Sequence, residues 1–176
     1  MTLEFKLEEA DFLEFQLYTA SKSDRIRKRK RNGWILFPLV ATVLSIRFFW
    51  IGNINMGIYF SVIASAAAGF YPLYFKWRYK GLFKKFIRDN YSARIGEKEV
   101  LEFRQKTLFI QDKTGEGEIK LKEIEGVTET ANHFFIGISS GTSLIIPKKE
   151  LDDVNGLRQK FHVLKLKLHE ELDWAW

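Results

Sequence analysis

The residues that could do acid, base or metal chemistry are few and scattered. The 176 residues include no cysteine, which excludes disulfides and thiolate chemistry, and three histidines, His133, His162 and His169. None of them has another histidine or a pair of carboxylates at metal-ligand spacing. In His169-Glu170-Glu171 the neighbouring side chains of a helix would point in different directions. This run is typical of a solvated helix end, and we expect no metal or cofactor.

Two polar turns carry residue types found in catalytic or phosphate-binding loops. The sequence Thr-Gly-Glu-Gly at 114–117, in the predicted turn 112–117, lacks the Gly-Lys-Ser/Thr ending of a phosphate-binding loop, and its glutamate would repel an anion. The run Ser-Ser-Gly-Thr-Ser at 139–143 has no base spaced to activate a hydroxyl group. We therefore assign no catalytic residue and expect a protein that is not an enzyme.

Two apolar stretches, 33–51 and 55–75, follow one another closely in the sequence. As helices they would be about 28 and 31 Å long, close to the roughly 30 Å of a bilayer hydrocarbon core. Between them lie turn-forming residues without charge, among them Gly52 and Asn53. The pattern predicts a transmembrane hairpin over 33–75 that is embedded in the lipid bilayer.

The excess positive charge of the chain is concentrated around this hairpin. Residues 1–24 carry a net charge of −4, residues 25–91 carry +12 and residues 92–176 carry −2, within a total of +6. Clustered Lys and Arg also occur in proteins that bind nucleic acid, but basic residues that directly precede an apolar stretch are typical of the cytoplasmic charge bias of membrane helices. We therefore expect no nucleic acid as a partner, and both termini in the cytoplasm. The membrane-orienting basic residues are Arg25, Arg27, Lys28, Arg29, Lys30, Arg31, Lys76, Arg78 and Lys80.

Small residues recur every fourth position in the second apolar stretch, at Gly57, Ser61, Ser65 and Gly69. Such a face allows membrane helices to approach closely. It is suited to packing within the hairpin, or to packing against a second copy of the chain or another membrane protein, so a homo-oligomer is one expectation. A transporter or channel subunit would need facing polar groups, for which the two stretches offer only Arg47, Ser61 and Ser65.

The segments next to the hairpin have helix and strand periodicities. Residues 1–7 alternate like a strand, and the acidic residues at 8–11 suit the start of a helix. We expect this helix to run through the basic segment into the first apolar stretch, so that 1–32 forms an N-terminal strand and a basic juxtamembrane helix. Apolar residues spaced among lysines predict that the second membrane helix continues over 76–91 as a basic amphipathic extension.

Residues 92–176 predict a cytoplasmic domain of short strands. The apolar residues at 151–168 recur at intervals of three and four, which indicates a C-terminal helix. Several antiparallel strands closed by one helix predict a small, partly open barrel and an α+β fold overall. The predicted strands are 100–103, 107–110, 118–121, 125–130, 134–139 and 143–146.

Several short motifs occur in a characteristic order along the chain. They are Glu9-Ala10-Asp11-Phe12, the two apolar stretches, Lys80-Gly81-Leu82-Phe83, Phe134-Phe135-Ile136 and Ile145-Ile146-Pro147-Lys148. This order resembles the YcxB-like family of bacterial membrane proteins. The resemblance implies a two-helix transmembrane hairpin in the inner membrane, followed by a small antiparallel pleckstrin-homology-like (PH-like) barrel capped by a C-terminal helix.

The resemblance also suggests what the domain does. PH-like domains that bind lipid headgroups usually use basic residues in the first strand turn, where Arg104 and Lys106 lie in this sequence. We expect a non-enzymatic docking or regulatory module for a membrane-associated protein partner. The alternative is a membrane-tethered sensor of anionic lipid headgroups, with Arg104 and Lys106 as contacts.

Overall fold

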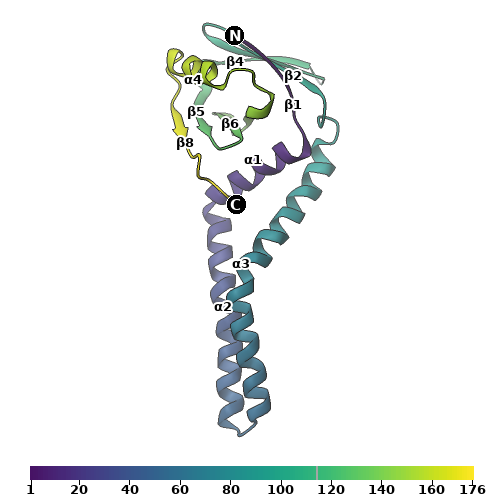
Figure 1. Cartoon of the computed structure of the whole chain (residues 1–176), viewed down its shortest axis with the longest axis vertical. Helices are drawn as coiled ribbons and strands as arrows, with labels where there is room; N and C mark the ends of the chain where they lie inside the picture. Colours follow the sequence, from purple (N-terminus) through teal and green to yellow (C-terminus); the bar gives the residue numbers. More distant parts are fainter. Residues whose placement is uncertain (114) are drawn as a thin grey trace. The chain divides into compact units, whose positions relative to one another are not determined.

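The computed structural model describes residues 1–113 and 115–176, which form an α+β protein (Figure 1). Thr114, in the predicted turn 112–117, lies outside the described residues. The chain divides into two compact units. We call Met1–Gln16 with Lys84–Ala175 the strand-rich unit, and Leu17–Phe83 with Trp176 the helical unit.

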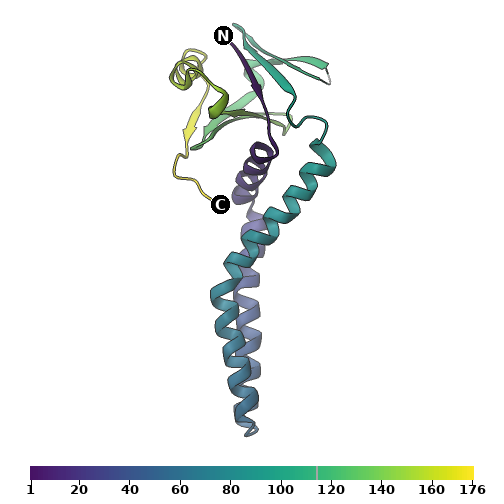
Figure 2. The same cartoon turned by 45° about the vertical axis from the view of Figure 1, so that its right-hand side comes forward.

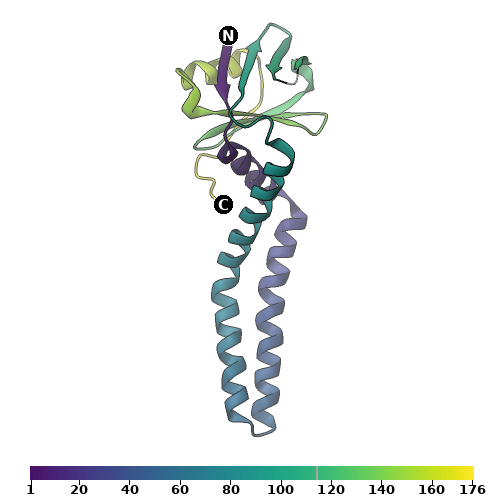
Figure 3. The same ribbon diagram turned by 90° about the vertical axis from the view of Figure 1, so that its right-hand side faces the viewer.

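The helical unit is built on α2 (Asp24–Trp50) and on the part of α3 (Ile54–Tyr91) that precedes Lys84. The portions of the two helices next to their connecting turn lie side by side in all three views (Figures 1, 2 and 3). Both helices are long and apolar enough to cross a membrane. Only 11% and 6% of their most apolar 18-residue windows are buried. Their apolar side chains therefore face outward, as they do in helices surrounded by lipid.

The predicted continuous helix at the start of the chain is interrupted. Helix α1 (Glu9–Lys22) ends before Ser23, whose extended backbone (ψ 118°) separates it from α2. Ser23 occupies the N-cap position without a side-chain capping hydrogen bond, and Asp24 lies in the first turn of α2, where a negative charge is stabilising.

The first sheet of the strand-rich unit includes the N-terminal strand. Its order is β1-β2-β3-β4, and all neighbours are antiparallel. Leu3 of β1 is opposite Leu101 of β2, and both side chains are buried; Figure 1 shows β1 in purple beside β2. The strands are β1 (Thr2–Lys6), β2 (Lys98–Phe103), β3 (Thr107–Asp112) and β4 (Gly115–Lys120).

The second sheet has the order β7-β6-β5-β8, and β8 runs parallel to β5. A short 3-10 helix, η1 (Leu121–Glu123), separates β4 from β5, and a second, η2 (Lys148–Glu150), follows β7. The α+β class is confirmed, but the strands form two four-stranded sheets and not a closed barrel, because the chain turns through η1 between them. The strands are β5 (Ile124–Glu129), β6 (His133–Ile138), β7 (Ser143–Pro147) and β8 (Leu168–Glu170).

The C-terminal helix is shorter than its apolar periodicity predicts. Helix α4 (Val154–Val163) ends where Lys165 takes a left-handed backbone conformation (φ 55°) and the Leu166 N–H donates to the Phe161 carbonyl at 3.0 Å. This geometry is a common helix stop. The prediction of a helix as far as Leu168 is therefore wrong, and Leu168 begins β8 instead.

The core lies between the two sheets and α4. The Phe161 ring of α4 meets Phe103 of the first sheet at 5.8 Å and Phe134 of the second at 5.5 Å, both edge-on. Phe134 and Phe161 are fully buried. Aromatic pairs in this geometry contribute about 0.5–1.5 kcal/mol beyond the area that they bury.

Candidate functional site

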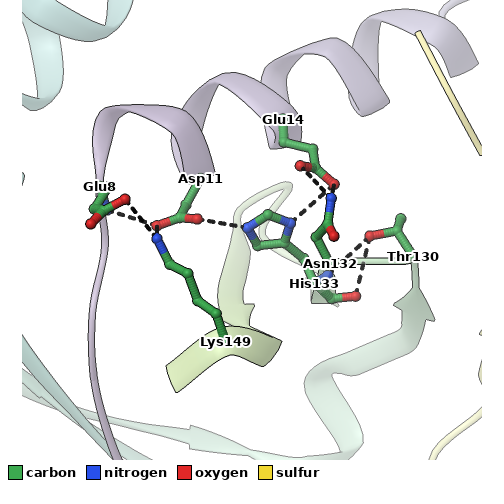
Figure 4. A network of polar contacts seen from close by, with 7 residues as sticks. All are labelled: Glu8, Asp11, Glu14, Thr130, Asn132, His133 and Lys149. Carbon is green, nitrogen blue, oxygen red and sulfur yellow. Dashed lines mark hydrogen bonds and ion pairs between the residues drawn. The ribbon is translucent and has the colours of Figure 1, made fainter. Parts of the chain in front are cut away.

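A partly buried polar cluster surrounds the buried side chain of His133 at the start of β6 (Figure 4). The imidazole Nε2 lies 2.9 Å from Asp11 Oδ1, and Nδ1 lies 3.1 Å from Glu14 Oε1. The second approach is at ion-pair distance, but its angle does not make a hydrogen bond. The side chains of His133 and Asp11 are only 4% exposed. We call Glu8, Asp11, Glu14, Thr130, Asn132, His133 and Lys149 the His133 cluster.

The first turns of α1 place the two carboxylates. Asp11 Oδ2 accepts a hydrogen bond of 2.7 Å from the backbone N–H of Glu8, which precedes α1. This is the side-chain-to-backbone half of a capping box, and it holds the Asp11 side chain in position. Glu14 lies three residues later, on the same helix face. Both carboxylates therefore face the second sheet.

A tight turn between β5 and β6 places the histidine. The Thr130 N–H donates to the His133 carbonyl at 2.9 Å, and the His133 N–H donates to Thr130 Oγ1 at 3.1 Å. Asn132, within the turn, donates from Nδ2 to both carboxylate oxygens of Glu14, at 3.2 and 3.3 Å. The turn therefore contacts Glu14 through two of its side chains.

Lys149 of η2 supplies a second cation to the cluster. Its Nζ lies 2.6 Å from Glu8 Oε2 and 3.6 Å from Asp11 Oδ2. Asp11 is thus flanked by His133 and Lys149, as Figure 4 shows. Within the strand-rich unit, the arrangement joins the first turn of α1 to two other segments, the turn before β6 and η2.

The electrostatic environment favours the charged forms of all three inner groups. Burial by itself would raise the pKa of Asp11 and Glu14, but His133, which is hydrogen-bonded to Asp11 and lies at ion-pair distance from Glu14, lowers both below their ordinary values of 3.8 and 4.5. Burial would lower the pKa of His133, but the two carboxylates raise it above its ordinary value of 6.5. The cationic form of the histidine is therefore favoured between the two carboxylates.

The cluster borders an open cavity of about 450 Å³. Both imidazole nitrogens face carboxylates, at 2.9 Å from Asp11 and 3.1 Å from Glu14, so neither nitrogen is directed at the cavity alone. Within 1–113 and 115–176, no group of three or more His, Cys, Asp or Glu side chains is arranged to hold a metal. The geometry is suited to binding a proton and to fastening α1 to the second sheet. The cavity is lined by Asp11, Glu14, Ala131, Asn132, His133, Lys148 and Lys149.

A second buried ion cluster lies on the neighbouring strand. Glu129, whose side chain is fully buried, is 2.5 Å from Arg158 Nη2 and 2.6 Å from Lys148 Nζ. Burial alone would raise the pKa of Glu129, but hydrogen bonds from Arg158 and Lys148 lower it. Lys148 Nζ also donates to the Thr130 carbonyl at 2.6 Å, so this cluster adjoins the turn that carries His133.

The turn predicted to contact lipid headgroups has its arginine already paired. Arg104 Nη1 lies 2.6 Å from Glu118 Oε1, and Nη2 lies 2.8 Å from Glu102 Oε2. The guanidinium also lies over the Phe109 ring, at 4.6 Å from its centroid. Lys106 is exposed. Headgroup binding by Arg104 and Lys106 stays a prediction, for which Arg104 would have to leave two carboxylates.

The membrane-orienting basic residues lie on α2 and α3. Arg27 pairs with Asp24 at 2.5 Å, and Arg78 Nη1 donates to the Tyr74 hydroxyl at 2.8 Å. Lys76 Nζ donates to the Trp176 carbonyl. The remaining residues of the set are exposed: Arg25, Lys28, Arg29, Lys30, Arg31 and Lys80.

The small residues of the second span divide into two pairs. Gly57 and Ser61 meet α2: Ser45 Oγ donates to the Gly57 carbonyl at 2.8 Å and lies 2.7 Å from Ser61 Oγ. A Cβ atom on Gly57 would come within 2.6 Å of the Phe49 ring. Ser65 and Gly69 are exposed, and a Cβ atom on Gly69 would meet nothing within 4 Å. Half of this face therefore packs inside the hairpin.

Sequence reasoning missed the partners of His133. The signal was present: a histidine opens the strand His-Phe-Phe-Ile-Gly-Ile, whose positions are almost all buried, and a buried histidine needs polar partners. Asp11 and Glu14 could not be recognised as these partners, because more than a hundred residues separate them from His133.

The two sheets with their C-terminal helix and the paired apolar helices define the class of this protein: an α+β domain attached to a helical hairpin. The family model described as YcxB-like protein matches residues 103–161, from the end of β2 to α4. The resemblance to this family is thereby confirmed over that segment, which contains His133, Glu129 and Arg158. No curated protein and no solved structure matches the chain.

Proposed function

We propose that this chain is a non-enzymatic protein of the bacterial inner membrane whose PH-like strand-rich unit is a docking or regulatory module for a protein partner. The observation that carries the proposal is the exposure of α2 and α3, whose most apolar windows are only 11% and 6% buried. An apolar surface of this extent needs lipid around it to be stable. The helices therefore serve as the anchor of the strand-rich unit.

The charge distribution supports an orientation with both termini in the cytoplasm. Basic residues occupy the start of α2 and the part of α3 that follows its apolar window, whereas Gly52 and Asn53 of the connecting turn are uncharged. Cytoplasmic flanks of membrane helices carry such an excess of Lys and Arg.

The ion clusters of the strand-rich unit support a docking role over a catalytic one. His133 is paired with two carboxylates, and Glu129 with two cations. Groups held in this way stabilise a fold, whereas a catalytic base needs a nitrogen or oxygen directed at the substrate.

The absence of cysteine from the sequence allows a sharp test of orientation. A single cysteine is introduced by Asn53→Cys in the turn, or by Lys122→Cys in the strand-rich unit, and intact cells are treated with a membrane-impermeant maleimide. We expect labelling of Asn53→Cys in intact cells and of Lys122→Cys only after lysis. The reverse pattern would contradict the orientation, and labelling of neither position until lysis would contradict the membrane anchor.

Partner docking is tested by photo-cross-linking in living cells. A photoreactive amino acid replaces Glu116 on β4 or Val163, which is 75% exposed, with the same replacement of Asn53 as the matched control. We expect one defined protein adduct from a position on the strand-rich unit and none from Asn53. Equal adducts from all three positions, or none from the strand-rich unit, would contradict the proposal.

The alternative function, a sensor of anionic headgroups through Arg104 and Lys106, requires the full chain in its test, because β1 forms part of the first sheet. The double variant R104Q/K106Q is compared with K120Q/K122Q, which removes the same charge from exposed positions nearby. Native mass spectrometry then counts the phosphatidylglycerol molecules retained by each protein. A loss confined to the first variant would support the alternative, and equal retention would exclude this contact.

A further inference from the structure

A basic cavity opens between α2 and α3 within the helical unit. Its volume is about 410 Å³, and its walls combine cationic and aromatic side chains from the start of α2 with an aromatic side chain and a proline of α3. We call this cavity the basic notch. It is lined by Arg27, Lys30, Arg31, Trp34, Tyr71 and Pro72.

A proline and a tryptophan hold one wall of the notch. Proline has no N–H, so Pro72 leaves the Ala68 carbonyl without its usual helical donor. The Trp34 indole N–H supplies this donor from α2, at 2.8 Å. The two helices are therefore joined beside the cavity through a backbone group that would otherwise be unsatisfied in an apolar setting.

A glycine on α2 makes room for the tyrosine of the notch. A Cβ atom on Gly33 would lie 1.9 Å from the Tyr71 hydroxyl oxygen, so a larger residue here would require the Tyr71 side chain to move. The Tyr71 ring also packs against Phe37, with 5.8 Å between the ring centroids. The phenol is thereby fixed next to the basic residues of α2.

The charge of the notch is unbalanced. Three cations line it and no carboxylate does. Arg27 is paired with Asp24 at 2.5 Å, whereas Lys30 and Arg31 are exposed and have no ion pair in the described part of the chain. Two cationic groups are thus available to an anion at the mouth of the cavity.

We propose that the basic notch binds the phosphate group of an anionic phospholipid. Basic pockets between membrane helices on the cytoplasmic side are suited to such headgroups, and Trp and Tyr favour the same depth in the bilayer. Phe37 and Leu73, which are 60% and 63% exposed, continue the surface away from the charges and offer apolar contact to acyl chains. This feature favours a lipid over free phosphate, which would gain nothing from the apolar surface.

The inference rests on the membrane placement proposed above, so insertion is measured first. The full chain is reconstituted into lipid nanodiscs and then transferred to detergent, where native mass spectrometry follows the binding of added phosphatidylglycerol. A protein that does not enter nanodiscs would contradict the membrane placement itself. If the protein inserts but binds phosphatidylglycerol no better than phosphatidylcholine, the proposal of a lipid site in the basic notch is overturned, while the membrane placement stands.

The site is tested with variants that differ only in where charge is removed. K30Q/R31Q removes two charges from the notch, and R25Q/K28Q removes two from the same helix outside the lining. We expect binding of phosphatidylglycerol to weaken about tenfold in the first variant and much less in the second. Equal weakening in both would show a diffuse attraction to the basic segment and overturn the proposal.

Two further arms address the role of charge and the source of the phosphate. K30R/R31K keeps both charges, and we expect it to retain binding; a loss as large as in K30Q/R31Q would show that binding does not follow the charge of the notch and would overturn the proposal. Inorganic phosphate is added as a competitor at increasing concentration. If it displaced phosphatidylglycerol at equimolar concentration, the site would be one for free phosphate and the lipid assignment would be overturned.

Discussion

Asp11 and His133 are 122 residues apart in the sequence, and they meet through a 2.9 Å contact between Oδ1 and Nε2 in which each side chain is only 4% exposed. Asp11 lies in the first turn of α1, and His133 begins β6. The contact therefore fixes the first turn of α1 against the second sheet within the strand-rich unit.

Replacing the histidine should destabilise the protein. His133→Gln keeps a polar side chain but removes the cation, which leaves Asp11 and Glu14 as neighbouring anions. Breaking a buried ion pair costs about 3–5 kcal/mol, and Lys149 offsets part of this, so we expect a loss of about 2–4 kcal/mol. The temperature of unfolding in detergent measures the effect. His162→Gln, at an exposed position of α4, is the matched control and should leave this temperature unchanged.

The contribution of the His133 cluster should depend on pH. The pKa of folded His133 is raised above 6.5, so its contribution is complete below 6.5 and is lost as the pH rises through the raised value. The pKa values of Asp11 and Glu14 are lowered from 3.8 and 4.5, so their contributions are complete above these values and are lost as the pH falls through the lowered ones.

The stabilisation should therefore be greatest between about pH 4.5 and 6.5, because in this range the contribution of the histidine and those of both carboxylates are present together. Unfolding temperatures of the wild type and His133→Gln, measured from pH 4 to 8, check this. We expect the difference between the two proteins to be largest near the middle of that window. A difference that does not vary with pH would show that the histidine acts through packing alone.

Neutralising the second buried acid should also be costly. Glu129→Gln leaves Lys148 without its carboxylate, while Arg158, which is about one-third exposed, can turn toward water. We expect a loss of about 2–3 kcal/mol in the free energy of unfolding. Thermal unfolding monitored by fluorescence is the measurement. Glu125→Gln, an exposed position on the same strand, should change stability by less than about 0.5 kcal/mol.

The parts of the structure that sequence reasoning predicts are those with a local signal. Hydropathy predicts the two long apolar helices, and alternation predicts most strands of 92–176. The arrangement of the strands in two sheets has no such signal, because it depends on η1 and on the distant pairing of β1 with β2. The His133 cluster was missed for the same reason: more than a hundred residues separate its inner carboxylates from its histidine.

The length of the last helix shows how a local signal can mislead. The apolar residues Leu164 and Leu168 continue the helical spacing, but the left-handed conformation of Lys165 ends α4, and Leu168 pairs with Val127 in the second sheet. Lysine in this conformation is strained by about 1 kcal/mol, whereas glycine is not. We expect Lys165→Gly to raise the free energy of unfolding by about 0.5–1 kcal/mol. Lys160→Gly, inside α4, should lower it by a similar amount.

The bond from Trp34 to the Ala68 carbonyl allows a prediction in which two substitutions cancel. Trp34→Phe removes the indole donor, and Pro72 cannot replace it, so the carbonyl loses its partner and we expect a cost of about 1 kcal/mol. Pro72→Ala restores a backbone N–H that can bond to Ala68 within α3.

In the Pro72→Ala background the tryptophan is no longer the only donor, so Trp34→Phe should cost less there than in the wild type. Unfolding of the four proteins in mixed micelles measures the coupling, which we expect to be about 0.5–1 kcal/mol. Additive effects would mean that the indole contributes through its ring and not through its N–H. Coupling of the expected sign would establish that α2 compensates for the proline of α3, and that the wall of the basic notch depends on this single hydrogen bond.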